Sequence, residues 1–155
     1  MSTIIRTRER VNRRRMTAWE ILGGSNVLGA KAESNLAWHR LITRGFSFRT
    51  VGKAAETLSL GDRSFAGFLG MSKSTFDRRK QEGRLDADES ERVYRAARLF
   101  AEALNVFEVV DKAAKWFGEP NRGLGGHRPV EMLATEVGSR EVENILGRLL
   151  YGGYS

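Results

Sequence analysis

The 155-residue chain has no cysteine and only two histidines, and these absences exclude several kinds of site. Without cysteine there can be no disulfide, no thiol nucleophile and no thiolate metal site. His39 and His127 remain as the only strong nitrogen ligands, and their wide separation in the sequence favours ordinary surface or core histidines. We therefore expect neither a metal site nor a bound cofactor.

Long apolar runs and prolines are also scarce. No run of about 18 apolar residues is present, so no membrane span is expected. Residues 1–15 lack the apolar middle of a secretory signal, and we therefore expect a cytoplasmic protein. Two prolines and little alternation of β-branched residues favour helices over strands, which predicts an all-α fold.

Positive charge is concentrated at the start of the chain. The whole chain carries a net charge of +7, and from Arg6 to Arg15 six arginines stand against Glu9 alone, a net charge of +5. We interpret residues 1–15 as a basic arm that contacts DNA phosphates or, alternatively, as a solvated terminus.

Two helical patterns follow the basic segment. Residues Thr17 to Leu22 end at a pair of glycines, and Glu33 to Thr43 end before Gly45. We assign residues 16–48 to an N-terminal helical layer in which Trp19 and Trp38 are core residues.

A helix-turn-helix pattern lies within a predicted DNA-binding domain over residues 49–106. Two short helical segments, Asp62 to Leu69 and Lys73 to Glu82, are separated by Gly70, Met71 and Ser72. Glycine permits the left-handed turn and serine caps the second helix. Met71 and Phe76 are predicted to point inward and to hold the two helices together.

The second helix of this motif would present its first turns to the DNA major groove. We predict that Lys73, Ser74, Thr75 and Arg78 point outward, with Lys73 and Arg78 suited to guanine. The residues predicted to meet phosphate are Ser72, Arg79, Lys80 and Arg84. The segment 62–84 carries six basic and three acidic residues, a net charge of +3, although helical hairpins with a central glycine also occur in proteins that do not bind DNA.

Further helices are predicted after the motif. Asp86 and Glu89 form a capping-box pattern that begins a helix to about Leu104, and a helix over Glu108 to Phe117 follows. The glycine-rich loop after it fits neither phosphate-loop fingerprint, and we interpret it as a rigid connector.

Two last helices complete the chain. Pro129 is suited to begin a short helix to Ala134, and Ser139 is predicted to cap a helix over Arg140 to Tyr151.

The order of residues over the last forty positions resembles the C-terminal domain of Xre/MbcA/ParS-type antitoxins, the partners of RES-domain toxins. The residues that carry this resemblance are Trp116, Pro120, Asn121, Leu124, Gly125, Gly126, Pro129, Met132, Leu133, Thr135, Gly138, Val142, Leu146, Gly147, Leu149, Tyr151 and Gly152. The resemblance extends more loosely back to Gly61. It implies an Xre-like helix-turn-helix bundle followed by a small helical toxin-binding domain, which we place at residues 107–155.

The resemblance also implies partners and roles. Such proteins are homodimers that bind operator DNA, repress their own operon and cover the NAD cleft of an NAD-consuming RES-domain toxin. The residues expected to meet the toxin are Arg148, Tyr151, Gly152, Gly153, Tyr154 and Ser155. The tail 152–155 is interpreted either as a plug for the nucleotide cleft or as a frayed end. Arg79 departs from the family pattern, because an apolar residue often stands on that side of the helix.

Two functions therefore remain in view. The first is an antitoxin that inhibits a RES-domain toxin and represses its own operon. The second is a transcriptional regulator whose C-terminal domain only dimerises or senses a ligand. An enzyme is not expected, because the carboxylates lie mostly among Arg and Lys on helix faces, where ion pairs are the ordinary arrangement.

Overall fold

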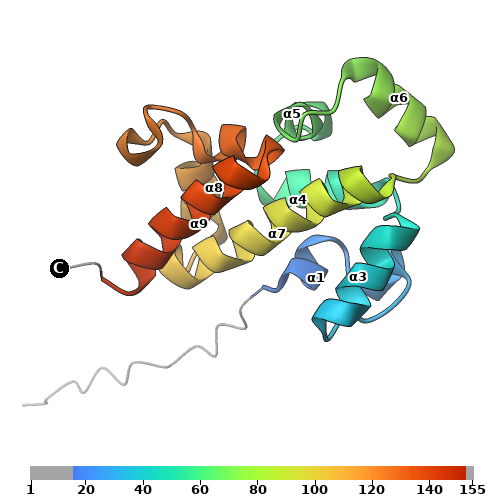
Figure 1. Cartoon of the computed structure of the whole chain (residues 1–155), viewed down its shortest axis with the longest axis horizontal. Coiled ribbons are helices and arrows are strands. Elements are labelled where there is room, and N and C mark those ends of the chain that lie inside the picture. Colours follow the sequence, from blue (N-terminus) through green and yellow to red (C-terminus); the bar gives the residue numbers. More distant parts are fainter. Residues whose placement is uncertain (1–15, 153–155) are drawn as a thin grey trace, which may run out of the picture.

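A computed structural model describes residues 16–152, and within them every regular element is a helix. Figure 1 shows the arrangement of the helices around the long helix α7. The elements are α1 Ala18–Ile21, α2 Ser25–Leu28, α3 Asn35–Arg44, α4 Arg49–Thr57, α5 Asp62–Phe68, α6 Lys73–Glu82, α7 Ala87–Phe107, α8 Val110–Gly118, the 3-10 helices η1 Arg122–Leu124 and η2 Pro129–Ala134, and α9 Glu136–Leu150. The predicted all-α fold class is confirmed. No helix within residues 16–152 is long and apolar enough to cross a membrane.

Helix α7 is the central element of the fold. It begins at the predicted capping box, in which the Asp86 carboxylate accepts from the backbone N–H of Glu89 and the Glu89 carboxylate accepts from that of Asp86. Alanines at positions 96, 97 and 103 are fully buried, and their small side chains let neighbouring helices approach closely. The helix continues to Phe107, beyond the predicted end at Leu104.

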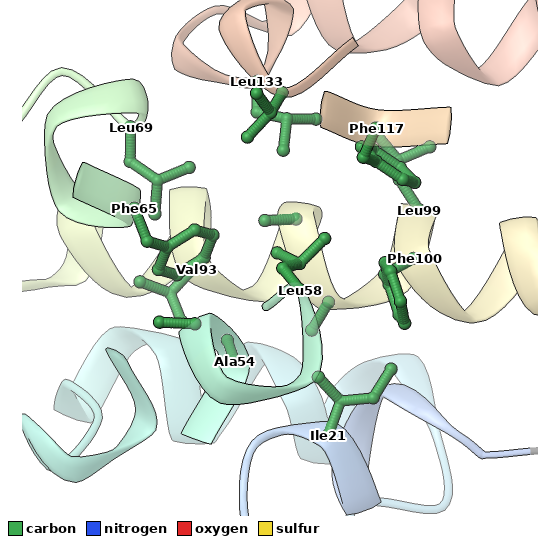
Figure 2. Close-up of a cluster of buried hydrophobic side chains, with 14 of the residues drawn as sticks. Ile21, Ala54, Leu58, Phe65, Leu69, Val93, Leu99, Phe100, Phe117 and Leu133 are labelled. Atoms are coloured by element: carbon green, nitrogen blue, oxygen red, sulfur yellow. The ribbon is translucent and has the colours of Figure 1, made fainter. Parts of the chain in front are cut away.

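Two groups of helices cover opposite sides of α7. Figure 2 shows Ile21, Ala54 and Leu58 on one side, while Phe117 and Leu133 lie on the other. The first group comes from α1, α4 and the C-cap of α4, Leu58, and the second from α8 and η2. One continuous apolar core therefore joins the N-terminal and C-terminal parts of the chain.

The N-terminal layer contains the two predicted helices, whereas Trp19 and Trp38, predicted as core residues, are half-buried and pack against the core. Thr17 caps α1 in a capping box with Glu20, and the Trp19 indole N–H donates to the Ala30 carbonyl over 3.0 Å. Trp38 on α3 lies against Tyr94 of α7 with 4.5 Å between ring centroids. No helix is predicted between Leu22 and Glu33, where the structure contains α2, whose Val27 and Leu28 are buried.

The last helix begins earlier than predicted. Its N-cap is Thr135, whose hydroxyl accepts from the Gly138 backbone N–H over 3.0 Å, so Ser139 lies inside the helix and is not its cap. Gly138 is required here, because an added Cβ would lie 2.3 Å from the backbone carbonyl oxygen of Met132. Gly138 thus allows η2 and the first turn of α9 to approach closely, whereas its neighbour Val137 is exposed.

Two other boundaries differ from the prediction. Glu108 has φ of 63° and ends α7 in a left-handed conformation, so α8 begins at Val110 and not at Glu108. Pro129 begins the predicted short helix, but that helix is of the 3-10 type.

Candidate DNA-binding and partner-binding surfaces

The turn between α5 and α6 has the geometry that the sequence predicts. Gly70 has φ of 80°, a left-handed conformation that favours glycine. The Ser72 hydroxyl accepts from the Thr75 backbone N–H over 3.2 Å and caps α6. The Arg92 guanidinium donates to the Leu69 carbonyl over 2.8 Å, which ties the turn to α7. The turn is therefore held by the Ser72 cap on α6 and by the Arg92 hydrogen bond from α7.

Helix α6 is held by one buried aromatic residue. Phe76 is 2% exposed and packs edge-on against Phe48 with 5.2 Å between ring centroids. Met71, in the turn, is also buried, so both residues point inward as predicted. Phe76 is the only buried residue of α6, and the rest of the helix projects from the body of the protein (Figure 1).

Most of the residues predicted to contact DNA lie on the exposed side of this motif. Thr75 is half-buried, and its hydroxyl accepts from that of Ser72 over 2.9 Å. Within residues 16–152, Lys73, Arg78 and Lys80 form no ion pair. The exposed members of the predicted set are Ser72, Lys73, Ser74, Arg78, Lys80 and Arg84. The exposed cationic groups on α6 itself are thus Lys73, Arg78 and Lys80.

Arg79 is placed differently from the other basic residues of α6. Its side chain is only 18% exposed, and its guanidinium forms ion pairs with Glu82 at 3.0 Å, Asp86 at 3.0 Å and Glu89 at 2.7 Å. A guanidinium engaged by three carboxylates presents no free positive charge to phosphate. The expected phosphate contact of Arg79 is therefore corrected to a structural role that joins the end of α6 to the start of α7.

The position of Arg79 affects the pKa of Asp86 and balances the buried carboxylate of Glu89. Burial raises the pKa of the Asp86 carboxyl, but the backbone N–H of Glu89 and the charge of Arg79 outweigh burial and hold that pKa below its usual value. Glu89 is 4% exposed, so its charge lies inside the protein and is balanced by Arg79. The cluster of Arg79, Glu82, Asp86 and Glu89 is called the Arg79 clamp below.

Arg84 also has a structural contact. Its guanidinium donates to the Gly45 carbonyl over 2.7 Å, and the Phe48 backbone N–H donates to the Gly83 carbonyl over 2.9 Å. These hydrogen bonds join the end of α6 to the segment between α3 and α4. The Arg84 side chain nevertheless stays exposed at the rim of the motif.

Sequence reasoning did not single out Arg63, which also belongs to this surface. Its guanidinium forms a 2.8 Å ion pair with Asp77 of α6 and lies 4.9 Å from the centre of the Phe76 ring. The Arg63 side chain is more than half exposed and lies on α5, beside α6. No residue spacing in the sequence identifies Arg63 as part of this surface, because its partner Asp77 lies on a different helix.

The C-terminal end of α9 forms a second surface. Val142, Ile145 and Leu146 are buried, whereas Leu149 and Leu150 are about half exposed at 50% and 44%, and Tyr151 is 84% exposed. Arg148 and Gly152 are exposed as well. The other predicted toxin-binding residues, Gly153, Tyr154 and Ser155, lie outside the described residues, as does the basic segment 1–15.

The two surfaces lie far apart. In Figure 1, α6 and the C-terminal end of α9 stand at opposite ends of the long axis of the molecule. Between them run α7 and the core that both parts share. Together these features define a helix-turn-helix protein with an additional small helical C-terminal domain.

Comparisons with known proteins agree with this division. The family model of the antitoxin Xre-like helix-turn-helix domain matches residues 37–98, and that of the antitoxin Xre/MbcA/ParS C-terminal toxin-binding domain matches residues 102–152. The Arg79 clamp lies wholly inside the first match, and the exposed end of α9 lies in the second.

Several curated relatives carry the name Antitoxin Xre. The relative from Photorhabdus laumondii is 32% identical over 128 residues, which are 81% of this chain and 86% of the relative. The relative from Pseudomonas putida is 32% identical over 121 residues, 77% of this chain and 74% of the relative. That from Yersinia enterocolitica is 39% identical over 85 residues, 54% of this chain and 57% of the relative. The chain belongs to the Xre antitoxin family.

Proposed function

We propose that this protein is the antitoxin of a toxin-antitoxin pair whose toxin is an NAD-consuming RES-domain enzyme, and that it also binds operator DNA and represses its own operon. Family membership supports an antitoxin with a toxin partner and a DNA-reading domain. The observation that carries the two-fold role is the separation of the exposed α6 from the exposed apolar end of α9. The protein would act by binding and not by catalysis, as a homodimer on DNA.

DNA binding would use the exposed residues of the helix-turn-helix. Lys73 and Arg78 would donate to guanine in the major groove, and the hydroxyls at positions 72, 74 and 75 would meet bases or phosphates close to the start of α6. Lys80 and Arg84 would contact phosphate. Arg79 is excluded from this set, because the clamp occupies its guanidinium.

Toxin binding would use the end of α9. Leu149, Leu150 and Tyr151 expose apolar surface at the same end of the helix as Arg148, and an aromatic residue beside an arginine is typical of interface centres. In this proposal the tail 152–155 continues from that surface and reaches the NAD cleft of the toxin.

Co-expression with the product of the adjacent gene tests the antitoxin role. We expect the two proteins to purify as one complex and NAD levels to fall in cells that express the toxin alone. A chain truncated from Glu141 should fail to protect, because it loses the buried Val142, Ile145 and Leu146. If the full chain never restores NAD, the protein is a plain transcriptional regulator instead.

The basic segment requires a separate test. If residues 1–15 contact phosphates, their deletion should flatten the dependence of DNA affinity on salt, because fewer counterions are released on binding. An unchanged slope of log affinity against log salt concentration would show that the segment is a solvated terminus.

A further inference from the structure

A second basic surface lies beside the end of α6, on residues outside the helix-turn-helix motif. Arg44 is the last residue of α3, Arg49 is the first of α4, and Arg84 follows the end of α6. All three residues are exposed. Figure 1 shows α3 and α6 at the same end of the long axis of the molecule. These three arginines are called the Arg44 patch below.

The backbone holds the Arg44 patch in a fixed position beside α6. An antiparallel bridge pairs Ser47 with Arg84, so the segment between α3 and α4 runs along the residues that follow α6. Gly45 has φ of 91°, and a Cβ added there would collide with the Leu85 carbonyl oxygen, so the close contact requires glycine. The arginines at the end of α3 and the start of α4 therefore keep their place relative to the helix-turn-helix.

Each guanidinium of the patch is held by a backbone carbonyl and by no carboxylate of the described residues. Arg84 uses one N–H for the carbonyl bond described above. Arg49 donates to the Asn26 carbonyl over 3.4 Å, and Arg44 donates to the Leu28 carbonyl over 3.5 Å. A carbonyl orients a guanidinium without neutralising its charge, so the other N–H groups of each fork stay available to an anion.

Acidic residues are absent from the described lining of the patch. Arg44 and Arg84 line a hollow of about 310 Å³ whose other lining residues are apolar or neutral. The carboxylates next to Arg84 in the sequence, Glu82 and Asp86, both form ion pairs with Arg79. Within residues 16–152 the patch itself forms no ion pair. The surface therefore carries an excess of positive charge.

We propose that the Arg44 patch binds the phosphate backbone of the operator, beside the major groove that α6 enters. The inference rests on the proposed DNA binding and adds contacts from outside the helix-turn-helix motif. Duplex DNA is the partner that fits, because guanidinium forks match phosphate oxygens and the patch continues through Arg84 from the exposed cations of α6. Phosphate contacts carry no sequence information, so the patch supplies affinity and register, whereas Lys73 and Arg78 supply preference.

The test measures the affinity of the full chain for two duplexes, one from the region upstream of its gene and one with that sequence scrambled. Salt is raised from about 50 to about 200 mM, and each phosphate contact contributes about 0.9 to the slope of log affinity against log salt. The double variant Arg44→Gln/Arg49→Gln should reduce the slope by about 1.8 on both duplexes. Over this range the wild type should then lose about twelvefold more affinity than the double variant.

Two other variants are the controls. Arg44→Lys/Arg49→Lys keeps both charges and should keep the wild-type slope. Lys112→Gln removes one exposed positive charge from α8, in the C-terminal domain, and should keep it as well. Melting temperatures without DNA show whether each variant is folded. If the double glutamine variant unfolds early, each single glutamine variant should still reduce the slope by about 0.9.

Three results would overturn the proposal. A wild-type slope in the folded glutamine variants, in a protein that binds both duplexes, would remove the patch but leave the proposed function intact. Lost preference for the upstream duplex at an unchanged slope would mean that these arginines read bases and not phosphates. If the wild type binds neither duplex, the proposed DNA binding itself fails, and the patch fails with it.

Discussion

The substitution Arg79→Met tests whether the Arg79 clamp stabilises the protein. Methionine keeps much of the apolar length of the side chain but removes the guanidinium that contacts Glu82, Asp86 and Glu89. The Glu89 carboxyl, which is 4% exposed, would then have the Asp86 backbone N–H as its remaining donor. We therefore expect Arg79→Met to destabilise the fold, because it removes the cationic partner of the buried Glu89 carboxylate.

The magnitude follows from the exposure of each partner. Glu82 and Asp86 are each 49% exposed, and such surface pairs contribute about 0.5 kcal/mol apiece. The pair with buried Glu89 is a charge-assisted bond, for which the loss of one partner costs about 1.5–3 kcal/mol. The sum is about 2.5–4 kcal/mol, which for a chain of this length lowers the melting temperature by roughly 5–16 °C.

Urea and thermal unfolding followed by circular dichroism measure this loss at pH 7. Arg78→Met is the matched control, since Arg78 is exposed, lies next in sequence and forms no ion pair among the described residues. We expect the control to change the free energy of unfolding by less than about 0.5 kcal/mol.

The destabilisation should depend on pH. Folding holds the pKa of Asp86 below its usual value, so its contribution to stability is present above the unfolded-state pKa and is lost as the pH falls through the folded-state pKa. The difference between the wild type and Arg79→Met should therefore shrink in acid, below about pH 4. A difference that stays constant or grows on acidification would contradict this account of the clamp.

Two other outcomes would refute the reasoning. If Arg79→Met unfolds at the same urea concentration as the wild type, the ion pairs contribute nothing measurable. If it keeps full stability but loses affinity equally for all DNA sequences, Arg79 contacts phosphate after all, and the ion pairs rearrange on DNA.

The remaining predictions concern DNA, the toxin and the last helix. Lys73→Ala and Arg78→Ala should each reduce preference for the operator by about 1–3 kcal/mol per base contact in mobility-shift titrations at fixed salt, and unchanged preference in both would remove them from the base-reading set. Deletion of residues 152–155 should leave folding and DNA binding intact but weaken protection against NAD loss; full protection would rule out the plug. Gly138→Ala should destabilise by about 1–3 kcal/mol, since its methyl group would lie 2.3 Å from a backbone oxygen, whereas Gly147→Ala, with open space around it, should be neutral or stabilising in urea unfolding.

Local signals predicted much of the fold because they act within a few residues. The capping box of Asp86 and Glu89, the glycine at position 70 and the cap at Ser72 each need only neighbouring backbone groups, and all three are confirmed. Helix α2 was missed, because a single turn between two glycines is too short to show a periodic apolar pattern.

The start of the last helix shows the limit of such signals. Thr135 and Ser139 are both good N-cap residues, and sequence alone does not decide between them. Packing decides, since Gly138 allows the first turn of α9 to meet the backbone of η2 and Ser139 is buried beside α7. The helix therefore begins one turn earlier than predicted.

By itself the sequence determined the helical class, the helix-turn-helix and the family, because periodicity, caps and turn residues are local and the family pattern lies in their order. Only the tertiary structure decided which charged side chains form ion pairs and which stay unpaired in solvent. Arg78 and Arg79 are adjacent in sequence, yet one points into solvent and the other into three carboxylates, two of which, Asp86 and Glu89, lie at the start of α7. Whether a charged group forms an ion pair or a polar atom forms a hydrogen bond depends on residues that only folding brings close together.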